Sequence, residues 1–157
     1  MQKSEIYTFF HRLRLSQTLT ISFLVLTALI ILIANYIHGG LLESKMQHEY
    51  LVIILFAIVN LTVVLLLNGK IKRALLQCMP DDSIKAKLIN FRKAYFKQLF
   101  WTTVLVLLNN LAFLLTGLEL IFLQTFALLI FLLSLQPTAG KFLKHSALPD
   151  QQKQLFY

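Results

Sequence analysis

Four long stretches of this chain carry no charged residue, and this pattern constrains the fold more than any other feature. They cover residues 15–42, 50–69, 98–118 and 120–140. A helix needs about 20 apolar residues, at roughly 1.5 Å each, to cross the ~30 Å hydrocarbon core of a bilayer. The sequence therefore predicts an all-α integral membrane protein with four transmembrane helices. The predicted spans are residues 16–37, 50–68, 98–116 and 120–135.

The distribution of basic residues predicts how these helices are oriented. Fourteen of the 15 Lys and Arg residues precede the first stretch, separate the second from the third, or follow the fourth, and only Lys45 lies elsewhere. Short basic loops stay on the cytoplasmic side during insertion. We therefore expect a multi-pass protein of the cell inner membrane, with both termini in the cytoplasm. Its four spans are expected to form two hairpins joined by a basic cytoplasmic segment.

Composition excludes several other classes of protein. Hydrophobic residues make up 57% of the chain, which excludes an ordinary soluble domain. The formal net charge of +8 flanks the spans, so we assign it to topology and to a bilayer with anionic headgroups, and not to nucleic acid. Cys78 is the only cysteine, so no intramolecular disulfide or cysteine-based zinc site is expected.

The segment between the second and third spans has the pattern of an amphipathic helix over about residues 81–97. Pro80, two aspartates and Ser83 form a typical helix start. An apolar stripe follows, whose members fall within about 80° of one another at 100° per residue. The stripe contains Ile84, Leu88, Phe91, Tyr95 and Leu99, and the basic residues Lys85, Arg92, Lys93 and Lys97 occupy other faces. Such a helix is expected to lie on the membrane surface, or alternatively to dock on a partner subunit.

Three amides are the main polar groups inside the predicted spans. Asn60 lies near the middle of the second span, and Asn109 and Asn110 lie at a similar depth in the third. An unpaired amide in hydrocarbon costs several kcal/mol, so these side chains are expected to find partners. They predict either a polar contact between helices or a docking point for another membrane subunit.

Catalytic and metal-binding residues are not expected in this chain. No Asp, Glu, Lys, Arg or His lies in the middle of a predicted span, although proton and ion pathways need such groups. His38 and His48 share the predicted outer loop, but their spacing suits no zinc site. No catalytic set of side chains can be assembled from the remaining residues. We therefore expect no enzyme activity, no metal and no cofactor.

The order of features resembles the ATP synthase protein I family, which are small four-span proteins encoded with the F-type ATP synthase. Basic residues and a glutamine enter the first span at residues 12–17, and an asparagine, Asn60, lies within the second. Lys97 matches the family's lysine before the third span, but the Gly-Glu pair that precedes it and the family's glycine-rich hairpin are absent. The resemblance implies a non-catalytic helper in assembling the membrane rotor of that enzyme.

Three functions remain open on these grounds. The first is a non-catalytic accessory or assembly protein that binds a larger integral membrane protein. The second is a membrane immunity protein that neutralises a pore-forming toxin, since such proteins are also small, basic and four-span. The third is a small oligomeric channel or carrier, with a polar path built from the span amides.

Overall fold

The computed structural model describes residues 3–38, 49–69, 73, 83–146, 148 and 153–156. All elements in this part of the chain are helices, which confirms the predicted all-α class. Their bounds are α1 (Lys3–His38), α2 (Glu49–Asn68), α4 (Ile84–Thr116), α5 (Glu119–Ser134), α6 (Ala139–His145) and the short 3-10 helix η1 (Gln154–Phe156). Residues 39–48 of the predicted outer loop, Cys78, and residues 81–82 of the predicted central helix lie outside the described residues.

Three of the described helices, α1, α2 and α4, are long and apolar enough to cross a membrane. α5 is also apolar but has only 16 residues. This agrees with the prediction of a membrane-embedded protein, because helices of this length and hydropathy are typical of transmembrane segments.

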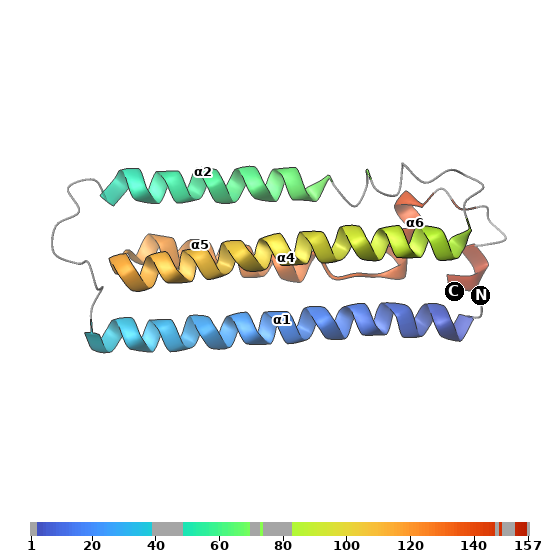
Figure 1. Cartoon of the computed structure of the whole chain (residues 1–157), viewed down its shortest axis with the longest axis horizontal. Coiled ribbons are helices and arrows are strands. Elements are labelled where there is room, and N and C mark those ends of the chain that lie inside the picture. Colours follow the sequence, from blue (N-terminus) through green and yellow to red (C-terminus); the bar gives the residue numbers. More distant parts are fainter. Residues whose placement is uncertain are drawn as a thin grey trace.

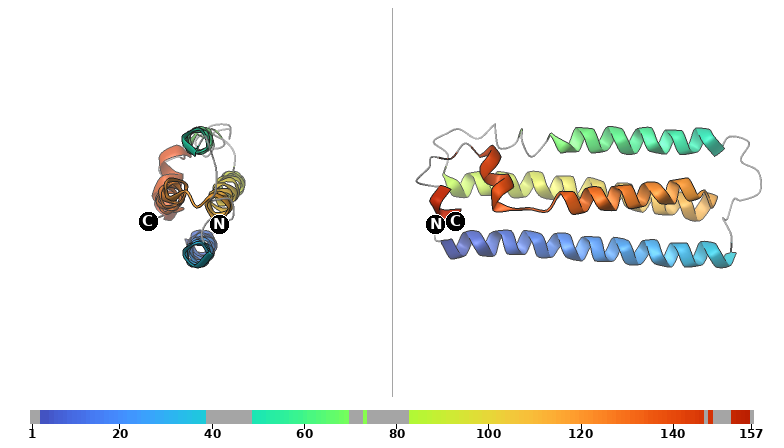
Figure 2. Two further views of the ribbon diagram at one scale, coloured as in Figure 1. Left: turned by 90° about the vertical axis from the view of Figure 1, so that its left-hand side faces the viewer. Right: turned by 180° about the vertical axis from the view of Figure 1, so that it is seen from behind.

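The long helices run side by side along one axis, with α4 and α5 forming an antiparallel hairpin (Figure 1). Gly117 makes the turn between them possible, because its φ of 70° is a left-handed conformation that favours glycine. α1 and α2 lie on opposite sides of the α4–α5 pair, as the end-on view in Figure 2 shows. The expected hairpin of the first and second spans is therefore not a closely packed pair, because α4 and α5 separate these helices.

α1 and α4 are too long to be confined to a bilayer core. Their 36 and 33 residues correspond to lengths of about 54 and 50 Å, whereas the hydrocarbon core is roughly 30 Å thick. Both helices begin at the same end of the molecule, next to α6 and η1 (Figure 1). The central basic helix predicted from the sequence is thus the first part of α4, which continues without a break into the third predicted span. Ser83 caps its start by accepting a hydrogen bond from the Ala86 amide, 3.2 Å away.

A cluster of aromatic rings joins α1, α4, α6 and η1 where they meet. We call it the aromatic cluster and define it as Phe10, Phe91, Phe142 and Phe156. The ring centroids of Phe91 and Phe142 lie 5.5 Å apart and those of Phe10 and Phe91 6.0 Å apart. The four rings lie outside the predicted spans, at one end of the molecule. The aromatic cluster therefore gives this end a hydrophobic core of its own.

This core corrects the expected placement of the apolar stripe on α4. Leu88, Phe91 and Tyr95 are almost completely buried inside the protein, and Ile84 is half-buried against them, so this stripe packs mainly against other helices of the protein. The basic residues Lys85, Arg92, Lys93 and Lys97 are exposed, as an amphipathic helix requires. The physical reason is that α1 carries a matching stripe, Ile6, Phe10 and Leu13, and each stripe removes the other from water.

Candidate functional site

Amide side chains from three helices meet in the middle of the bundle. Asn60 of α2 and Asn109 of α4 exchange two hydrogen bonds, each 3.0 Å long. The Asn60 amide nitrogen also donates to the Gln124 side-chain oxygen of α5, at 2.8 Å. Gln124 in turn donates to the Ile53 carbonyl, at 3.4 Å. We call Asn60, Asn109 and Gln124 the amide cluster, and it links α2 to both members of the central hairpin.

Asn110 takes no part in the amide cluster, although it adjoins Asn109 in sequence. Neighbouring residues on a helix point about 100° apart, and Asn110 faces α5, where its oxygen accepts a hydrogen bond of 3.1 Å from the Thr125 hydroxyl. The structure therefore joins two of the three predicted asparagines to each other and the third to a different partner. Both contacts connect helices.

Gln124 and Thr125 of α5 are partners that the sequence analysis did not assign to the three asparagines. The sequence did contain a signal for their depth. Asn110 lies seven residues before Gly117, and Gln124 lies seven residues after it. In a tight antiparallel hairpin, residues at equal distances from the turn lie at equal depth, but this does not identify their partners, which are Thr125 for Asn110 and Asn60 for Gln124.

Two further glutamines lie buried near the start of the spans. Gln17 of α1 donates from its amide to the Leu132 carbonyl of α5, which ties the outer helix α1 to the hairpin. Gln98 of α4 is 1% exposed, and neither of its amide atoms has a hydrogen-bond partner in the part of the chain that the structure describes. Unpaired polar atoms in a protein interior cost about 1–3 kcal/mol each, so Gln98 is a costly residue at this position.

The chemistry open to these groups is limited to hydrogen bonding. Amides and hydroxyls do not change protonation state at physiological pH, so the amide cluster cannot relay protons as buried carboxylates or histidines do. Each amide contact between membrane helices is worth about 0.6 kcal/mol, and up to roughly 2. The amide cluster is thus suited to holding α2 in place. Among the described residues, no group of three or more His, Cys, Asp and Glu side chains could hold a metal ion.

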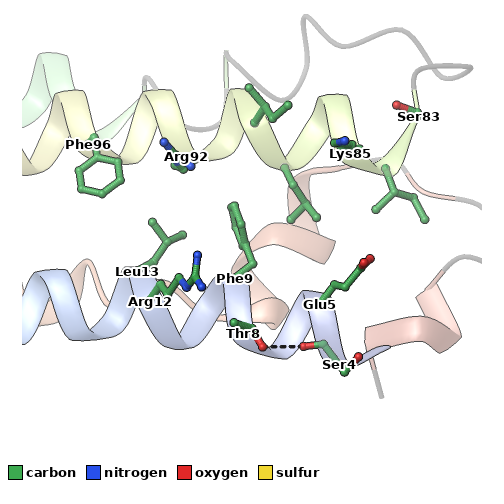
Figure 3. Close-up of a pocket in the computed structure, with 13 residues that line it drawn as sticks. Ser4, Glu5, Thr8, Phe9, Arg12, Leu13, Ser83, Lys85, Arg92 and Phe96 are labelled. Atoms are coloured by element: carbon green, nitrogen blue, oxygen red, sulfur yellow. Dashed lines mark hydrogen bonds between the residues drawn. The ribbon is translucent and has the colours of Figure 1, made fainter. Parts of the chain in front are cut away.

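A groove of 1140 Å³ lies between the first turns of α1 and of α4. Its floor is apolar, and includes Phe9, Leu13, Leu88 and Phe96. Figure 3 shows Arg12 extending from α1 towards α4, with Arg92 and Lys85 on the facing helix. Glu5 is the one acidic residue among the described lining residues. The groove therefore combines a basic rim with an apolar floor.

A smaller cavity of 230 Å³ lies on the other side of α1, against α6 and η1. Its lining includes Lys3, His11 and Arg14, so it is basic as well. Arg14 is already engaged, because its side chain donates a hydrogen bond of 3.3 Å to the Pro137 carbonyl. This contact fixes the segment between α5 and α6 against α1, and the cavity is less open to a ligand than the groove.

Comparisons of the chain with models of known protein families, with curated proteins and with solved structures find no match.

Proposed function

We propose that this chain is a non-catalytic accessory or assembly protein of the cell inner membrane, which binds a larger integral membrane protein. In this proposal the chain crosses the membrane four times, with α5 as the fourth span and with both termini in the cytoplasm. α5 is short, but the amide cluster holds Gln124 level with the middle of α2 and with Asn109, which lies near the middle of the predicted third span. The basic residues that follow it, Lys141 and Lys144, suit a cytoplasmic segment.

The observation that carries the proposal is the unequal burial of the long helices. In the 18-residue apolar stretch of α1, and in that of α2, only 11% of the residues are buried within the protein. In the corresponding stretch of α4, 39% are buried. α2 touches the rest of the protein mainly through Asn60, Leu67 and a few half-buried side chains. Large apolar residues cover its remaining surface, among them Ile54, Ile58 and Leu65. A helix held by polar contacts on one face, and apolar on the others, can pack against a partner without disturbing its own fold.

The amide cluster favours this function over a channel. The amides that would line a polar path in an oligomer bond to one another and to the Ile53 carbonyl. To line such a path, the amides would have to turn away from one another, which would break the hydrogen bonds that hold α2 against α4 and α5. The resemblance to the ATP synthase protein I family makes the membrane rotor of an F-type ATP synthase the first partner to test.

Site-specific photocrosslinking in native membranes tests the proposal. A photoreactive amino acid at Ile58, which is 56% exposed on α2, should give a crosslink to a larger membrane protein. The matched control is Leu67 on the same helix, which is 2% exposed and should give no intermolecular crosslink. Purification through a C-terminal tag in mild detergent should recover the same partner. If the chain is recovered alone, and neither Ile58 nor other exposed positions of α1 and α2 crosslink to another protein, the proposal is wrong.

A further inference from the structure

The groove between α1 and α4 lies at the level where both helices leave the predicted spans. Arg12 precedes the uncharged stretch that begins at Leu15 by three residues, and Arg92 precedes the one that begins at Gln98 by six. At 1.5 Å per residue these offsets are about 5 and 9 Å, and the headgroup layer is roughly 5–8 Å deep on each side of the hydrocarbon core. In the proposed topology, the two guanidinium groups therefore lie in or beside the headgroup layer of the cytoplasmic leaflet.

The apolar end of the groove points towards the hydrocarbon. Leu13 and Phe96 line this end, whereas Glu5 lies at the opposite end (Figure 3). One turn further along α4, on the same face as Phe96, lies Phe100, which is 61% exposed. Two turns beyond Arg12 on α1 lies Leu19, which is 62% exposed. The floor of the groove is thus continuous with apolar surface that the proposed topology places against acyl chains.

We propose that this groove binds one anionic phospholipid of the cytoplasmic leaflet, with its phosphate between Arg12 and Arg92 and an acyl chain over Phe96. This proposal rests on the four-span topology proposed above. Guanidinium groups bind phosphate through paired, charge-assisted hydrogen bonds, and two of them on different helices can hold one phosphate from two sides. Lys85 adds positive charge on the same rim. The three basic side chains outnumber the single carboxylate of Glu5, so an anionic headgroup is favoured over a zwitterionic one.

The geometry also predicts what the lipid does. Because Arg12 belongs to α1 and Arg92 to α4, a phosphate bound by both bridges two helices that meet at the aromatic cluster. A ligand that binds only the folded state stabilises that state by RT ln(1 + [L]/Kd), so the stabilisation rises with the free lipid concentration. An anionic lipid should therefore raise the thermal stability of the purified chain, and a zwitterionic lipid with the same acyl chains should not.

Native mass spectrometry of the purified full chain in a neutral detergent tests the proposal. The probes are phosphatidylglycerol, phosphatidylcholine with identical acyl chains, and inorganic phosphate. The chain should retain one molecule of phosphatidylglycerol, and the Arg12→Gln/Arg92→Gln variant should bind it at least about tenfold more weakly. The matched control is Lys93→Gln/Lys97→Gln, which removes the same charge from exposed positions of α4 outside the groove lining and should bind as the parent does. Circular dichroism checks that each variant keeps its helix content.

The remaining outcomes distinguish a specific lipid site from a general attraction between basic side chains and anionic lipid. Equal loss of binding in both double variants would show general attraction and overturn the site. Unchanged binding in the arginine variant, or equal affinity for phosphatidylcholine, would overturn it too.

Phe96→Ser should weaken phosphatidylglycerol binding, whereas Phe126→Ser, at an exposed position of α5, should not. Binding of inorganic phosphate as tight as that of the lipid would contradict a role for the apolar floor. Crosslinking through Ile58 is independent of these results, so failure of the lipid site and failure of the proposed function are distinguishable.

Discussion

At the scale of single residues, the amide cluster gives the sharpest expectation about stability. Asn109→Leu removes two hydrogen bonds to Asn60 and one of 2.8 Å to the Leu105 carbonyl. It also leaves the Asn60 oxygen without its partner in an apolar interior. We expect a loss of about 1–2 kcal/mol in the free energy of unfolding, measured by denaturant titration in mixed micelles.

The control is a double-mutant cycle with Asn60→Leu. In the double variant no orphaned amide remains at this contact, so its loss of stability should be smaller than the sum of the two single losses by roughly 0.6–2 kcal/mol. Additive effects would show that the two side chains do not interact. The depth of Asn60 and Asn109 was predictable by counting residues from the span ends. The hydrogen bond between Asn60 and Gln124 was not predictable. α5 is apolar on nearly every face, so its sequence does not show how the helix is rotated about its axis.

At the scale of elements, the first four turns of α4 show where sequence patterns mislead. The periodicity separated most of the buried face of this helix from its exposed face, since Leu88 and Phe91 are buried and Arg92 is exposed, although the basic residue Lys87 is buried as well. Periodicity does not show what covers the apolar face. The same stripe is expected whether the face packs against a membrane or against a neighbouring helix. The clue was a second stripe of similar length, at Ile6, Phe10 and Leu13, on the same predicted side of the membrane.

Truncating Phe91 should unfold the end of the molecule that holds the aromatic cluster. Phe91 is 1% exposed and contacts the rings of Phe10 and Phe142, and Phe→Ala substitutions in such cores cost about 3–5 kcal/mol. Amide hydrogen exchange should become faster in α6 and in the first turns of α1, and stay unchanged near the amide cluster. Phe96→Ala, at a position that is 39% exposed on the same helix, should have little effect in detergent without anionic lipid. Unchanged exchange in the Phe91 variant would mean that the aromatic cluster does not hold this end together.

At the scale of the whole molecule, the presence of long apolar helices followed from the sequence, and their arrangement did not. Charge-free runs show where apolar helices lie, but they contain no information on which helices are neighbours. α1 and α2 follow one another in the chain and still lie on opposite sides of the central hairpin (Figure 2). Many contacts are formed by apolar side chains such as Leu24, which is buried although its sequence neighbours Phe23 and Val25 are equally apolar and exposed.

The proposed topology predicts that the two ends of α5 lie on opposite sides of the membrane. Glu119, at its start, and Lys144, after its end, are both exposed, so either can be replaced by cysteine in a Cys78→Ser background. Glu119→Cys should react with a membrane-impermeant thiol reagent added to intact spheroplasts, and Lys144→Cys should react only after the membrane is opened. The 14-to-1 distribution of basic residues sets this orientation, because moving the basic side outward would carry fourteen cationic groups across the membrane against the positive-inside preference. Labelling of both positions from the outside would mean that α5 does not cross the membrane, and the reverse pattern would invert the orientation. Either result would also remove the lipid-binding groove from the cytoplasmic leaflet.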